Sequence, residues 1–194
     1  MGDLNFQERN NTDYLIYEGS TDPIYNGSLG NTVNYKGFHL NLFLTYAFGN
    51  VVRLDPVFKA KYNDLTSMNH DFKNRWMQPG DENVTNVPGV VSRYEYEQNR
   101  TLLSTAYNAY NYTSVRTAKG DFIRLKEISL AYDFPHRWLE NSPVNNISLK
   151  LQATNLMLLY ADKKLNGQDP EFMNAGGVAS PMPKQFTLTL KLGL

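Results

Sequence analysis

The chain has 194 residues, and its 19 lysines and arginines balance its 19 aspartates and glutamates, so no nucleic-acid partner is expected on electrostatic grounds. Cysteine is absent, which excludes disulfides, cysteine-ligated zinc and a thiol nucleophile, and no run of about 18 apolar residues predicts a transmembrane helix. The 13 tyrosines, 10 phenylalanines and 2 tryptophans favour β structure with aromatic belts or sugar-facing surfaces.

The first regular pattern along the chain predicts a β-hairpin. Residues 1–22 are polar and rich in turn formers, and an alternation of apolar and polar side chains follows them. We predict strands near 24–35 and 38–48, joined by a two-residue turn at Lys36-Gly37, because glycine tolerates the positive φ of such a turn. Each strand has about ten residues, the length that a tilted strand needs to cross a bilayer.

Residues 49–121 form the first long loop. They are polar and aromatic with little periodicity, except that Asp64 to Met77 predicts a short helix with Asp64 as its N-cap. A compact soluble domain seldom contains such a loop, whereas outer-membrane barrels combine long extracellular loops with short periplasmic turns.

Three further strands are predicted near 122–134, 147–156 and 185–194, with a second long loop at 157–184. In the first of these strands the apolar phase slips between Leu125 and Ile128, which indicates either a bulge near Lys126 or emergence of the strand from the membrane. The last strand reads Phe-Thr-Leu-Thr-Leu-Lys-Leu-Gly-Leu, so one of its faces is apolar and the other is polar or small.

The loop lengths indicate a membrane barrel. In an antiparallel sheet, the short connections at 36–37 and 135–146 fall on one side and the two long loops on the other, as outer-membrane barrels require. The predicted fold class is therefore all-β: an antiparallel up-and-down transmembrane β-barrel fragment of about five long strands, with two long extracellular loops and a short helix in the first. The predicted location is the cell outer membrane.

Several short motifs carry a family resemblance. They are Tyr35-Lys36-Gly37-Phe38, Arg75-Trp76 with Pro79-Gly80-Asp81-Glu82, the stretch from Gly120 to Tyr132, Thr154-Asn155-Leu156, Gly167-Gln168-Asp169-Pro170-Glu171, and Pro183-Lys184-Gln185-Phe186. With these motifs in this order, nearly the whole chain resembles the C-terminal barrel portion of SusC/RagA-type TonB-linked outer-membrane transporters.

The resemblance implies a function and a set of partners. Family members form a large barrel with an N-terminal plug, import oligosaccharides or peptides with energy relayed by TonB, and are capped by a SusD-like surface lipoprotein. For this chain it implies nutrient import, with the lipid bilayer, the remainder of the barrel and plug, the lipoprotein, and TonB through the plug as partners. The plug domain is absent from the sequence, so we expect the chain to be a piece of a longer protein.

Candidate ligand or lid contacts lie in the two loops. Trp76, Tyr94 and Tyr96 offer flat aromatic faces for sugar rings or for the lid lipoprotein, and packing within the loop is the alternative. Asp169 and Glu171 flank Pro170 in the second loop, where they would bind a cation or a ligand hydroxyl, or cap a turn.

Nothing in the sequence indicates catalysis. It contains neither a Gly-x-Ser-x-Gly elbow nor a glycine-rich phosphate loop. Glu127 and Asp133 share a strand face but lie roughly 20 Å apart, too far for a paired-carboxylate glycosidase. We predict no enzyme activity and no cofactor, and no metal either, since Asn5 to Glu8 lacks the acidic spacing of a calcium loop.

The strand faces also predict which residues line a hydrated lumen: His39, Asn41, Glu127, Gln152 and Lys191. The alternative function is that of a soluble all-β carbohydrate-binding domain. That reading requires strands 38–48 and 186–194 to pack on each other as a sandwich.

Overall fold

The computed structural model describes residues 15–57, 69–140, 143–173 and 182–193. The chain divides into two compact units. The sheet unit comprises residues 19–52 and 119–194, and the loop unit comprises residues 1–18 and 53–118. Within the described ranges, no helix is long and apolar enough to cross a membrane.

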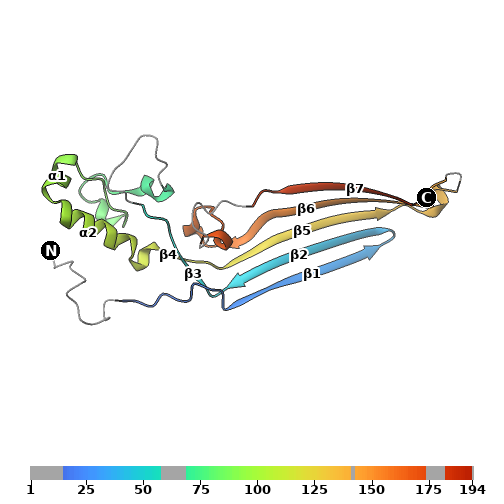
Figure 1. The fold of residues 1–194 in the computed structure, drawn as a ribbon, viewed down its shortest axis with the longest axis horizontal. Helices are drawn as coiled ribbons and strands as arrows, with labels where there is room; N and C mark the ends of the chain where they lie inside the picture. Colours follow the sequence, from blue (N-terminus) through green and yellow to red (C-terminus); the bar gives the residue numbers. More distant parts are fainter. Residues whose placement is uncertain (1–14, 58–68, 141–142, 174–181, 194) are drawn as a thin grey trace. The chain divides into compact units, whose positions relative to one another are not determined.

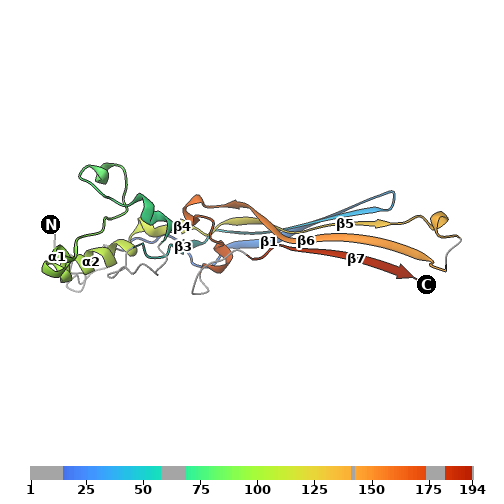
Figure 2. The same ribbon diagram turned by 90° about the horizontal axis from the view of Figure 1, so that it is seen from above.

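The sheet unit is built on one antiparallel sheet. Its strands are β1 (Tyr25–Tyr35), β2 (Phe38–Phe48), β5 (Phe122–Asp133), β6 (Asn146–Ala161) and β7 (Gln185–Gly193). They lie side by side in that order (Figure 1), which is an up-and-down arrangement. The strands twist about one another, so β1 and β7 separate toward the right of Figure 2. The predicted all-β antiparallel fold is confirmed, with a sheet that remains open.

The β1–β2 hairpin has a tight turn. All 11 residues of β1 pair with β2, from Tyr25 opposite Phe48 to Tyr35 opposite Phe38. Lys36 and Gly37 have φ values of 46° and 86°, as a type I′ turn requires. We call this end of the sheet the turn end and the opposite end the loop end.

Two strands contain bulges. Phe43 pairs with Glu127 and Leu44 with Leu125, so Lys126 is an extra residue in β5. Its insertion places the apolar residues before and after it on one face, so of the two explanations of the phase slip the bulge is the one observed.

The second irregularity is in β6. Its pairing with β5 shifts between Tyr160 and Leu158, and again between Met157 and Thr154, around Asn155, which has a φ of 54°. This irregularity hides the continuation of the strand in the sequence, so β6 runs on to Ala161 rather than ending at position 156.

The loop unit contains the α-helices, which the sequence analysis did not predict. These are α1 (Arg93–Gln98) and α2 (Arg100–Asn111). Ser92 caps α1 by accepting a hydrogen bond from Glu95 N at 3.1 Å. Part of the helix predicted at 64–77 falls outside the described residues, and His70–Asn74 is a 3-10 helix, η2. The residues buried in this unit include Leu54, Val57, Val87, Tyr107, Arg116 and Ala118.

The remaining elements are short. Strands β3 (Val51–Arg53) and β4 (Thr117–Lys119) form a two-stranded sheet. The 3-10 turns are η3 (Asp81–Asn83), η4 (Ser114–Arg116), η5 (His136–Trp138), η6 (Lys163–Leu165) and η7 (Pro170–Phe172). The first predicted loop is thus largely folded where the structure describes it.

Candidate functional site

One face of the five-stranded sheet is apolar from strand to strand. Residues paired across neighbouring strands share a face, and the register aligns Leu40, Leu130, Leu151 and Leu188 in one row. Leu130, Leu151 and Leu188 are 45%, 53% and 68% exposed. A soluble protein would cover such a band, whereas a barrel wall presents it to lipid.

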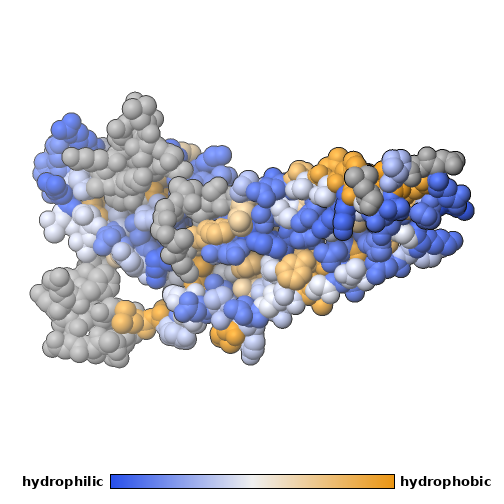
Figure 3. Space-filling model, turned by 45° about the vertical axis from the view of Figure 1, so that its right-hand side comes forward, coloured by the Kyte–Doolittle hydropathy of each residue, from blue (hydrophilic) through white to orange (hydrophobic). Residues whose placement is uncertain are grey.

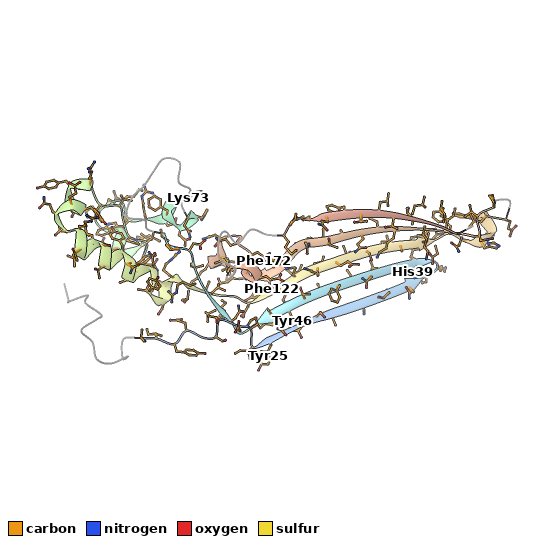
Figure 4. All side chains as sticks on the ribbon, in the orientation of Figure 1. Tyr25, His39, Tyr46, Lys73, Phe122 and Phe172 are labelled. Carbon is orange, nitrogen blue, oxygen red and sulfur yellow. The ribbon has the colours of Figure 1, made fainter. Side chains whose placement is uncertain are left out.

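Aromatic side chains border the apolar band at both ends. At the turn end Phe38 packs on Tyr132 with ring centroids 4.4 Å apart. At the loop end Tyr46 and Tyr160 both lie opposite Ile123, and Figure 4 labels Tyr46 there. Phe38 and Tyr46 are eight residues apart in β2, or about 26 Å, close to the band height of about 25 Å in outer-membrane barrels.

The other face of the sheet is polar. The residues predicted to line a lumen, His39, Asn41, Glu127, Gln152 and Lys191, all lie on it. Hydrogen bonds link the strands across this face: the two ring nitrogens of His39 lie 2.7 Å from Asn34 Oδ1 and 2.9 Å from Asp133 Oδ2. Figure 3 views the sheet from a direction in which polar side chains predominate.

A buried ion pair holds the second loop against this polar face at the loop end. Arg124 of β5 directs Nη2 to both carboxylate oxygens of Asp169, at 2.5 and 2.6 Å. Their side chains are 4% and 0% exposed. Glu171 Oε2 lies 3.3 Å from the same Nη2. One positive charge is therefore shared by two carboxylates.

These contacts give different environments to Asp169 and Glu171, the two acidic residues predicted as ligand contacts. Asp169 is enclosed, and its Oδ1 accepts a hydrogen bond from Glu171 N at 3.1 Å, so it caps η7. Glu171 keeps 42% of its side chain exposed. Arg124, which joins them, was not identified from the sequence; the available signal was a charged residue on the polar face of a strand.

Asp162 fixes the beginning of the second loop. Its carboxylate accepts hydrogen bonds from Lys119 N and Lys164 N, both at 3.0 Å. Burial alone would raise the pKa of Asp162, but these bonds and the two lysine charges outweigh it, so the pKa is lowered from 3.8. The loop is thus tied to the sheet unit at two points before its described part ends.

A cavity of about 700 Å³, here called the rim cavity, lies at the loop end of the sheet unit. The polar and aromatic residues that line it include Asp22, Asn26, Thr45, Phe122, Lys126 and Glu171. Figure 4 shows Phe122 and Phe172, from β5 and η7, at this same end of the sheet. The volume of the rim cavity is in the range of small-ligand sites.

The aromatic candidates belong to the loop unit. Trp76 is partly exposed; its backbone N donates to Val87 O at 3.0 Å, and its Nε1 donates to Gln78 O. Tyr94 is largely exposed on α1, and Tyr96 is half-buried there. Asp169 and Glu171 lie in the sheet unit, so the five candidates fall in two separate units.

A metal site was not expected from the sequence. Across the described ranges, no group of three or more His, Asp or Glu side chains is placed to hold a metal ion.

Comparison with known proteins bears on both sequence and fold. No family model matches the chain. TonB-dependent receptor P39 of Formosa agariphila is 26% identical over 192 residues, covering 93% of this chain and 17% of the relative. TonB-dependent receptor P3 of the same organism is 25% identical over 153 residues, covering 79% and 13%. The RagAB peptide importer in its open-open state matches in fold, with a TM-score of 0.62, 21% identity, and coverage of 92% of this chain and 18% of that one.

The chain matches a barrel segment of a SusC/RagA-type TonB-dependent receptor. The resemblance and the outer-membrane location predicted from the motifs are thereby confirmed. The relatives are named as receptors and importers rather than as enzymes, which agrees with the predicted lack of catalysis. The chain spans only 17% and 13% of the lengths of the two curated relatives.

Proposed function

We propose that the full protein imports a nutrient, an oligosaccharide or a peptide, across the outer membrane with energy relayed by TonB. The observation that carries the proposal is the two-faced sheet, with an exposed leucine band between aromatic residues on one side and polar residues on the other. Such a wall suits lipid outside and a hydrated pathway inside. The names of the relatives, TonB-dependent receptor and peptide importer, support it.

The proposal assigns partners to the parts of the chain. The sheet joins the remainder of the barrel, which encloses a plug, and TonB acts through that plug. A SusD-like surface lipoprotein caps the loops, where Trp76, Tyr94 and Tyr96 contact it or the ligand. Glu171 contacts ligand from the second loop, and the enclosed Asp169 holds that loop in place.

The test uses the full receptor in cells with and without functional TonB. Uptake of a labelled oligosaccharide or peptide is expected only with TonB, and the purified receptor is expected to be β-rich by circular dichroism and heat-modifiable on gels. Uptake that is independent of TonB, or a receptor that forms no barrel in detergent, contradicts the proposal.

The soluble carbohydrate-binding alternative gains nothing from the fold. A sandwich would place β2 and β7 in two sheets with their apolar faces together. Both strands instead belong to one sheet, and the register puts Leu40 and Leu188 on the same side of it.

A further inference from the structure

We propose that the rim cavity binds the amino-terminal end of a short peptide, with Glu171 and Asp22 receiving its ammonium group. This inference rests on the proposed import function and narrows its substrate to one class. The charged groups among the residues that line the cavity are two carboxylates, Asp22 and Glu171, and one ammonium, Lys126. A lining with charges of both signs fits a ligand that also carries both, as a peptide does and a neutral oligosaccharide does not.

The neighbouring ion pair leaves the cavity with an excess of negative charge. Arg124 Nη2 lies 3.3 Å from Glu171 Oε2, but it is already engaged by both oxygens of Asp169. Counting Arg124 and Lys126 against Asp22, Asp169 and Glu171 gives two positive and three negative charges. The group that balances them is a cation, and an ammonium can donate hydrogen bonds to carboxylates.

The wall that carries Glu171 is held in place before any ligand binds. Asp169 is fully enclosed and accepts the Glu171 N–H, so the backbone at Glu171 is tied to Arg124 of the sheet. The remaining surface suits the peptide chain itself, since Asn26 and Thr45 offer hydrogen-bonding groups and Phe122 an apolar surface. Pre-organisation of this kind lowers the cost of binding.

The experiment measures binding to the purified full receptor by calorimetry, with trialanine, N-acetyl-trialanine and maltotriose as probes. Wild type is compared with Glu171→Gln, with Asp22→Asn as a second cavity variant. Glu140→Gln is the matched control, because Glu140 is exposed between β5 and β6 and does not line the cavity.

We expect N-acetylation to weaken trialanine binding to wild type about tenfold, the scale of one charge-assisted hydrogen bond. Glu171→Gln and Asp22→Asn should each weaken trialanine binding several-fold and leave the acetylated peptide unchanged, and Glu140→Gln should have no effect. The inference is wrong if acetylation changes nothing, if the cavity variants weaken both peptides equally, or if maltotriose binds and trialanine does not. If any of these results is found while uptake still depends on TonB, the peptide inference fails and the proposed import function stands. If trialanine binds as expected but uptake does not depend on TonB, the import function fails and the peptide inference stands.

Discussion

Replacing Asp169 by asparagine should loosen the second loop while leaving the sheet intact. The substitution keeps the shape of the side chain and removes its charge, so Arg124 stays enclosed with only the exposed Glu171 as a charged partner. Removing one partner of a buried ion pair costs about 3–5 kcal/mol. Because Glu171 compensates in part, we expect the low end of that range, about 3 kcal/mol, or roughly a hundredfold more opening of the loop.

Hydrogen exchange measured by mass spectrometry on the full receptor reads this opening directly. Peptides covering 162–173 should lose protection in Asp169→Asn, and peptides from β1 and β2 should not. The control is the double variant Arg124→Met/Asp169→Leu, because replacing both charges by apolar side chains is often neutral. Unchanged protection in the single variant, or equal loss in single and double variants, would refute the reasoning.

Three further results are expected. Phe186→Lys places a charge on the apolar face, in the middle row of the band, so it should destabilise the barrel by about 2–4 kcal/mol and lower the heat-modifiable fraction. Thr187→Lys, on the polar face, should not lower that fraction, and equal losses in the two variants would contradict the face assignment. The lowered pKa of Asp162 means that its contribution to stability is present above about pH 4 and is lost as the pH falls through the folded-state pKa. Protection of the Lys119 amide should follow that course, and Asp162→Asn should abolish the pH dependence. Gly120→Ala should lower the stability of the fold by about 1–3 kcal/mol, because the added Cβ would stand 2.1 Å from Nδ2 of Asn50. An unchanged unfolding midpoint would contradict this.

Local sequence patterns predicted the parts of the fold that depend on neighbouring residues. The alternation from Phe38 to Phe48 matches β2, and the phase slip located the bulge at Lys126. The helix α1 was missed although Ser92 and Glu95 form the start of a capping box. The irregular backbone at Asn155 concealed the extension of β6, because it interrupts the period on which strand prediction depends.

The candidate site was less accessible to sequence reasoning because its defining contact is distant in the chain. Arg124 and Asp169 are 45 residues apart, and no local pattern connects a strand arginine with a loop aspartate. The sequence singled out Asp169 and Glu171 as a pair, yet their burial differs because only one of them is covered by the sheet. Which carboxylate stays open was decided by tertiary packing.

The bulge in β5 gives this strand one position at which its length can change without consequence for the membrane face. Deleting any other residue within the strand would turn every side chain beyond it to the opposite side. Deleting Lys126 would instead restore regular alternation, because Leu125 and Ile128 already share a face. Lys126, which lines the rim cavity, is therefore the residue whose loss would leave the alternation of the strand unchanged. Related barrels can gain or lose this charge by insertion or deletion of a single codon while their lipid contacts stay the same.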